Sequence, residues 1–104
     1  MIPDLVSEQI RPRIDAQPLV PAQAGAPVVP SSFEWRGETH VAVAMLEQWK
    51  ESSPCSHGSD EIYLRKHWYR LRMKDGGEWV VYFLRQPQRG KRPGARWWLY
   101  TRET

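Results

Sequence analysis

Hydrophobic and polar residues alternate along several stretches of the second half of the chain. In HWYRLRMK (67–74), one face holds Tyr69, Leu71 and Met73, and the other holds Trp68, Arg70, Arg72 and Lys74. In ARWWLYTRE (95–103), one face holds Trp97, Leu99 and Thr101, and the other holds Arg96, Trp98, Tyr100 and Arg102. Successive side chains of a strand point to opposite faces, so both stretches are predicted strands with one basic, aromatic face.

Glycine-containing turns separate the predicted strands. Arg36-Gly37 interrupts SFEWRGETHVAV (32–43), and the run 74–78 (KDGGE) follows the basic strand. Both are typical of tight hairpins, because glycine accepts the positive φ that such turns need. EWVVYFLR (78–85) is apolar on both faces and is predicted to be a central strand.

Residues 41–50 (VAVAMLEQWK) fit two patterns. Strand alternation places Val41, Val43, Met45 and Trp49 on one face, whereas helical spacing groups Val41, Ala44, Met45, Gln48 and Trp49. The β-branched start favours a strand, but the helix stays an alternative. Residues 51–61 have the composition of a loop.

The N-terminal third differs in composition. SEQIRPRID (7–15) alternates enough for a short strand, and Pro12 restricts it to a sheet edge. Residues 16–31, which we call the proline arm, contain Pro18, Pro21, Pro27 and Pro30. Prolines at this density exclude a helix or a central strand and predict an extended segment. We therefore divide the chain into residues 1–31, an edge strand plus the arm, and residues 32–104, a β domain.

The expected fold is mainly β: a small, curved antiparallel sheet or half-open SH3-like barrel of five or six strands. A chain of 104 residues forms one domain at most. With six tryptophans, its core is expected to be aromatic. The predicted core residues are Phe33, Trp35, Val41, Val43, Tyr69, Leu71, Val81, Phe83, Trp97 and Leu99.

The net charge of +3 is unevenly distributed. Residues 1–62 hold four basic and nine acidic residues, whereas residues 63–104 hold eleven basic and three acidic ones. This indicates either a surface that faces a polyanion or an acidic half that packs against a basic half of the same fold.

The residue types needed for catalysis are scarce. One cysteine, Cys55, and three histidines cannot make a cysteine-rich zinc site, and no phosphate-binding glycine loop occurs. We expect no enzyme, no metal and no cofactor. The N-terminus lacks the regions of a signal peptide, no apolar run reaches the roughly 20 residues of a spanning helix, and a lone thiol fits a reducing compartment. These features predict a cytoplasmic protein without membrane association.

Cations interleaved with aromatic rings suit single-stranded nucleic acid, because phosphates meet the cations and bases stack on the rings. One hypothesis is therefore a nucleic-acid-binding module. Its candidate residues are Trp68, Arg70, Arg72, Lys74, Arg89, Lys91, Arg92, Arg96, Trp98 and Arg102. The alternative is a protein-interaction or homo-oligomerisation module, in which the proline arm or a strand edge docks on an aromatic groove. A third interpretation assigns no ligand: Trp98 and Tyr100 pack under the arm of their own chain.

FEWRGETHVAVAMLEQW (33–49) resembles a family of small uncharacterised bacterial domains with the signature F-x-W-R-G followed by L-x-x-W. The matching residues here are Phe33, Trp35, Arg36, Gly37, Val41, Leu46 and Trp49. The later segments HWYRLRMKDGGEWVVYF and RWWLY are similar to the family's remaining strands, but the proline arm is longer than the pattern needs. Some members look to be encoded beside DNA-repair polymerases. The resemblance implies no catalytic or binding residues.

Overall fold

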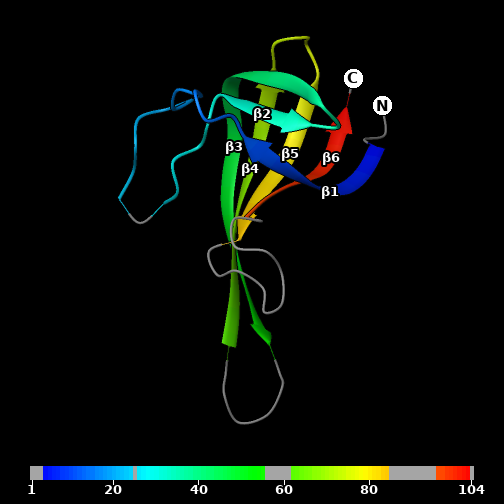
Figure 1. Cartoon of the computed structure of the whole chain (residues 1–104). Helices are drawn as coiled ribbons and strands as arrows, with labels where there is room; N and C mark the ends of the chain where they lie inside the picture. Colours follow the sequence, from blue (N-terminus) through cyan, green and yellow to red (C-terminus); the bar gives the residue numbers. More distant parts are fainter. Residues whose placement is uncertain (1–3, 25, 56–61, 85–95, 104) are drawn as a thin grey trace.

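The alternating segments form six antiparallel strands that pair in chain order and close into a ring (Figure 1). The strands are β1 (Asp4–Pro12), β2 (Ser32–Trp35), β3 (Glu38–Cys55), β4 (Ile62–Met73), β5 (Glu78–Leu84) and β6 (Trp97–Glu103). The computed structural model describes residues 4–24, 26–55, 62–84 and 96–103, with backbone pairing alone for 52–55 and 62–65. The predicted small antiparallel β domain is confirmed.

Both predicted hairpin turns are present. Arg36 and Gly37 adopt positive φ angles of 51° and 75° between the paired residues Trp35 and Glu38. Positive φ at both central positions is the type I′ geometry, whose twist matches that of the flanking strands. In the β4–β5 turn, Gly76 has a φ of 93°, and Asp75 Oδ1 accepts a hydrogen bond of 2.9 Å from the Gly77 amide.

β3 is a strand throughout, and two irregularities explain why its sequence also fitted a helix. Its pairing with β4 skips one residue between Ala42 and Ala44 and another between Met45 and Glu47. The skipped residues, Val43 and Leu46, are therefore β-bulges. Each bulge adds one residue and reverses which face the following side chains occupy. Three-residue spacing of inward positions results, and it imitates a helical period.

The same bulges correct two predicted core residues. Val41 and Val43 are 37% and 53% exposed, whereas Ala42 between them is 3% exposed and pairs with the buried Met73. Simple alternation thus assigned the wrong face to the start of β3. The loop predicted for residues 51–61 also begins later, because β3 extends to Cys55.

The strand expected at an edge instead closes the ring. β1 pairs with β6 along Asp4 to Ile10, and Arg11 and Pro12 pair with β2. Pro12 cannot donate a hydrogen bond, so its position at the last residue of β1 is compatible with pairing on both sides. A bulge beside Ser7, whose φ is 53°, bends β1 between its two partners.

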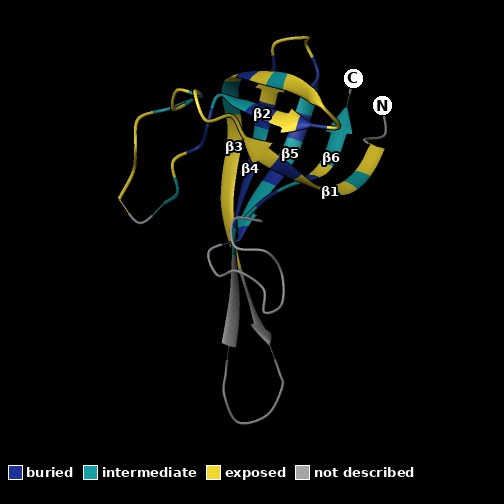
Figure 2. Ribbon diagram, in the orientation of Figure 1, coloured by how far each residue is buried: buried dark blue, intermediate teal, exposed yellow. Residues whose placement is uncertain are grey.

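Aromatic and branched side chains fill the interior of the ring. Figure 2 colours the buried residues of the strands dark blue. Five of them are less than 2% exposed: Ile10, Phe33, Leu71, Val81 and Leu99. Trp97 lies against three other rings, with centroid distances of 5.5 Å to Phe33, 5.9 Å to Tyr69 and 5.1 Å to Phe83. Of the predicted core residues, Phe83 is partly buried, and all others except Val41 and Val43 are buried.

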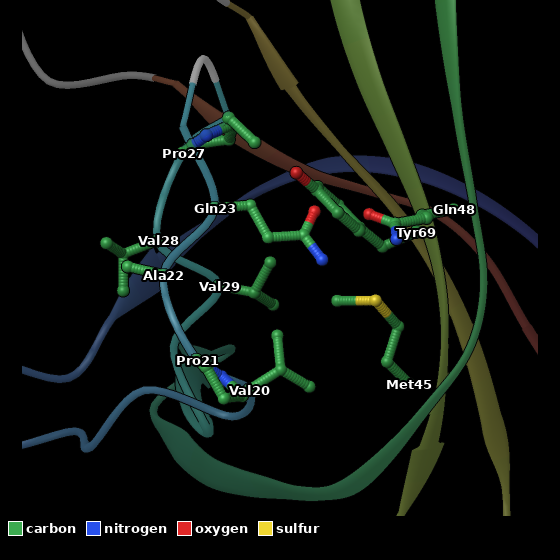
Figure 3. A pocket seen from close by; sticks show the side chains of 11 residues that line it. Val20, Pro21, Ala22, Gln23, Pro27, Val28, Val29, Met45, Gln48 and Tyr69 are labelled. Carbon is green, nitrogen blue, oxygen red and sulfur yellow. The ribbon is translucent and has the colours of Figure 1, made fainter.

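The proline arm folds back on its own ring. Within the arm, Leu19 N–H donates to Val29 O and Ser31 N–H donates to Gln17 O, each at 2.8 Å. Pro18 and Pro30 form an isolated antiparallel β-bridge between them. Val29 is 3% exposed and belongs to the core, and Leu19 packs against it. Figure 3 shows Val20 and Val29 of the arm and Met45 of β3 turned toward one another. The arm therefore closes one side of the core.

β3 and β4 continue beyond the ring. β5 pairs with β4 only from Lys66 to Arg72, so residues 52–55 of β3 and 62–65 of β4 pair with each other alone. They form a two-stranded ribbon that projects away from the other strands (Figure 1).

Candidate nucleic-acid interface

Four aromatic side chains form a row across the outside of the ring. Trp49 pairs with Trp68, Trp68 with Tyr82, and Tyr82 with Trp98, so each strand from β3 to β6 contributes one ring. Successive ring centroids are 5.8, 4.7 and 6.3 Å apart. The first and last pairs are nearly parallel, with interplanar angles of 1° and 8°. We call these four residues the aromatic row.

Trp68 is at the centre of this surface but is not exposed, contrary to the prediction from its strand. Its exposed fraction is 8%, although it does not belong to the interior core. Trp49, Tyr82 and Tyr100 cover it, and the Tyr100 ring meets it edge-on at 5.1 Å. Trp49 and Tyr100, which are 40% and 41% exposed, are the more accessible rings beside it.

Cations lie on both sides of the aromatic row. On one side, Lys66 Nζ is 4.8 Å from the centroid of Tyr82 and 5.8 Å from that of Trp68. On the other side, Arg70 lies 3.6 Å from a Glu47 carboxylate oxygen and 3.5 Å from one of Glu78. Arg70 is thus largely neutralised by neighbouring strands. This supports the interpretation that acidic and basic parts of the chain pack together.

Arg72 and Lys74 are exposed but lie farther along the chain from the row. Arg72 is near the end of β4, where it lies opposite Glu78 of β5 in the strand register. Lys74 is in the β4–β5 turn, where its amide donates to Val41 O at 2.7 Å. Lys74 therefore belongs to the turn and not to the aromatic row.

Arg102 is not beside Trp98, which corrects the prediction for the last strand. The pairing of β5 with β6 skips Tyr100, so the side chains after it change face. Arg102 pairs with the buried Trp79 and lies 5.1 Å from the ring centroid of Trp35.

Arg96 also lies apart from the row. Its guanidinium is 5.6 Å from the ring of Phe83, which packs on the interior Trp97. The candidates Arg89, Lys91 and Arg92 lie outside the described residues. In sequence they belong to the segment that joins β5, which carries Tyr82, to β6, which carries Trp98.

Two tyrosines, the buried Tyr69 and the half-buried Tyr82, keep their protons over a wide pH range. Burial raises the pKa of Tyr69 above its ordinary value of 10.0. Burial, and to a lesser degree the neighbouring Tyr100, raises the pKa of Tyr82 in the same direction. Both are therefore neutral at physiological pH, and the row carries no negative charge of its own.

Four contributors to this surface were absent from the candidate residues: Trp49, Tyr82, Lys66 and Tyr100, the last of which lies on the predicted face of its strand. Tyr82 could have been found by counting pairs away from the 74–78 turn, because a regular hairpin places it opposite Trp68. Trp49 could not, since two bulges separate it from the Arg36-Gly37 turn, and the loop predicted for residues 51–61 gave no register with the following strand. Lys66 lies one residue before the quoted pattern and follows the same alternation.

Other kinds of site find no support in the described ranges. They contain no group of three or more His, Cys, Asp or Glu side chains that could hold a metal ion. They also contain no helix that is long and apolar enough to cross a membrane.

A family model described as a domain of unknown function (DUF6504) matches residues 1–104. The chain belongs to the DUF6504 family. No curated protein and no solved structure matches this DUF6504 chain. The expected relationship to uncharacterised domains is thus confirmed at the level of a domain of unknown function, and the functional argument rests on the geometry of the aromatic row.

Proposed function

We propose that this domain binds single-stranded nucleic acid on the aromatic row and is a binding module, not an enzyme. The observation that carries the proposal is the alignment of Trp49, Trp68, Tyr82 and Trp98 across four strands. Stacking on protein rings suits unpaired bases of any identity, because every base has a π face. A double helix keeps its bases stacked on one another, so it should bind less tightly.

The charges near the aromatic row support binding of the domain to a polyanion with modest affinity. Arg70 is engaged with Glu47 and Glu78. Phosphate contacts therefore fall to Lys66 and Arg72, together with the basic residues in the sequence between β5 and β6. Lys66 is the cation nearest the rings, since its ammonium lies over Tyr82, and from there it can turn to meet a phosphate.

The alternative, a protein-interaction module that uses the proline arm, receives less support. Leu19 and Val29 of the arm pack on the core of their own chain, so undocking the arm would expose apolar surface. Pairing of two copies through β3 is disfavoured by the bulges at Val43 and Leu46, since bulges discourage edge-to-edge association. Trp98 and Tyr100 do not line the pocket beneath the arm.

The test is a titration of a labelled, mixed-sequence single-stranded oligonucleotide, followed by fluorescence anisotropy over a range of salt concentrations. The binding constant should fall with salt, with a log–log slope of about −0.7 per neutralised phosphate. Trp49→Ala should weaken binding by about tenfold, because one stacking ring is removed. Val43→Ala is the matched control, since Val43 is an exposed apolar residue of the same strand.

Two results would overturn the proposal. One is the absence of binding to any single-stranded oligonucleotide at low salt. The other is equal affinity of the wild-type protein and Trp49→Ala, with Val43→Ala unchanged.

A further inference from the structure

An open groove lies on the outer surface above Trp68. It is lined by Trp49, Glu51, Lys66, Trp68, Tyr82 and Tyr100, which come from four strands, and also by Ser7 and Val80. Trp49 and Tyr100 are its exposed aromatic residues, and Trp68 is the most buried of its rings. The groove is thus mainly aromatic and carries one cation, Lys66, and one carboxylate, Glu51.

The indole N–H of Trp68 lacks a hydrogen-bond acceptor among the described residues. The Nε1 atom has less than 1 Å² of exposed surface, and the whole side chain is 8% exposed. Buried indole N–H groups usually find a partner, because an unpaired buried donor is costly. An unsatisfied donor in a residue that lines a groove indicates that a ligand supplies the acceptor.

The hydrogen-bonding groups of the groove restrict the chemistry of that ligand. The Trp68 indole N–H and the Lys66 ammonium are donors only, whereas the Glu51 carboxylate accepts and the tyrosine hydroxyls can do either. A base edge with a carbonyl oxygen complements the unpaired indole donor, whereas an exocyclic amino group presents another donor to it. Uracil and thymine carry two carbonyls, while cytosine carries an amino group in place of one of them.

We infer that this groove is a subsite for one unpaired keto pyrimidine, a uracil or a thymine, whose carbonyl oxygen accepts the Trp68 Nε1 hydrogen bond. The inference rests on the proposed function, because it assigns a base preference to the same surface. Stacking alone does not distinguish one base from another, and the hydrogen bond from Trp68 Nε1 adds a contact that does.

Access to Nε1 requires a neighbouring side chain to move, since the atom is covered in the free protein. Lys66 is the flexible side chain that lies on the Trp68 and Tyr82 rings. A nucleotide that enters the groove brings a phosphate, which gives the displaced ammonium a stronger partner than a ring face. The Lys66 ammonium thus leaves the Tyr82 and Trp68 rings and contacts the phosphate, while the base contacts Trp68.

The experiment compares oligo(dU) with oligo(dC) of about ten nucleotides, a length within the site size of small single-strand-binding folds. The two pyrimidines have the same size and differ at two positions: uracil carries a carbonyl where cytosine has an amino group, and its N3 carries a hydrogen where that of cytosine is an acceptor. Wild-type protein should bind oligo(dU) about fivefold more tightly, the effect of one net hydrogen bond. Trp68→Phe keeps a ring in the row but removes the donor, and should bind both oligonucleotides equally.

Lys66→Met separates the charge from the hydrogen bond. It should weaken binding of both oligonucleotides and reduce the salt dependence by about one phosphate contact, while the preference for oligo(dU) remains. Far-ultraviolet circular dichroism of both variants checks the fold. A ligand-side comparison needs no variant: replacing thymine by its apolar isostere difluorotoluene should weaken binding to wild-type protein.

The outcomes distinguish the two proposals. Equal affinity of wild-type protein for oligo(dU) and oligo(dC), a preference that persists in Trp68→Phe, or unchanged binding of the difluorotoluene oligonucleotide would overturn the keto-base subsite and leave single-strand binding intact. Absence of binding to either oligonucleotide would overturn both.

Discussion

The indole N–H of Trp35 donates a hydrogen bond of 3.1 Å to the Glu8 carboxylate and so connects β2 to β1. Arg36 donates to the same carboxylate through both Nε and Nη2. β1 and β2 share only two paired positions, Arg11 with Glu34 and Pro12 with Phe33. The Glu8 contacts therefore reinforce the place where the ring has its shortest pairing. Arg36 adopts a left-handed conformation that places its side chain for this contact.

Glu8→Gln should make the stability of the domain less dependent on pH. The hydrogen bond from Arg36, assisted by the one from Trp35, lowers the pKa of Glu8 below 4.5. A carboxyl with a lowered folded-state pKa stabilises the fold above its unfolded-state pKa, and this contribution disappears as the pH falls through the folded-state value. Thermal unfolding should show a lower Tm for Glu8→Gln at neutral pH, and the difference should shrink below pH 4.5. A difference in Tm that stays constant across this range contradicts the prediction.

Val29→Ala should destabilise the domain, whereas Val28→Ala should not. Val29 is 3% exposed and packs in the core, while the adjacent Val28 is 52% exposed. Removing two buried methyl groups costs about 1–3 kcal/mol, whereas an exposed valine costs within about 0.5 kcal/mol. Urea denaturation of both variants measures the free energy of unfolding. Equal effects at the two positions mean that the arm does not dock on the ring.

Ala42→Leu and Val43→Leu test the bulge in β3. Ala42 is 3% exposed and pairs with Met73, so three added heavy atoms should overpack the core and cost about 1–3 kcal/mol. Val43 is exposed, and its substitution should change the free energy of unfolding by less than about 0.5 kcal/mol. A larger loss of stability in Val43→Leu than in Ala42→Leu would contradict the bulge and support simple alternation along β3.

Trp97→Ala should be the most damaging single change in the interior. Its ring is 5% exposed and contacts Phe33, Tyr69 and Phe83. Replacing such a residue by alanine costs about 3–5 kcal/mol, a large part of the stability of a small domain. Near-ultraviolet circular dichroism and thermal unfolding measure the loss. A Tm close to that of the wild-type protein contradicts the placement of Trp97 in the core.

Local patterns in the sequence determined the strands and the turns. Alternation defined β4 and β6, Arg36-Gly37 and the 74–78 run defined two hairpins, and the prolines excluded regular structure from the arm. These features depend on residues within a few positions of one another, because strand period and turn geometry are properties of short segments.

Only the tertiary structure decided which face each side chain occupies beyond a bulge. Val43, Leu46 and Tyr100 are extra residues that bend their strands as the ring closes, and nothing in their own sequence marks them. One inserted residue reverses every later position, which is why Arg102 lies on Trp35 and not beside Trp98. The burial of Trp68 is also a tertiary property, because the rings that cover it come from β3, β5 and β6 and meet only when these strands assemble with β4 into one sheet.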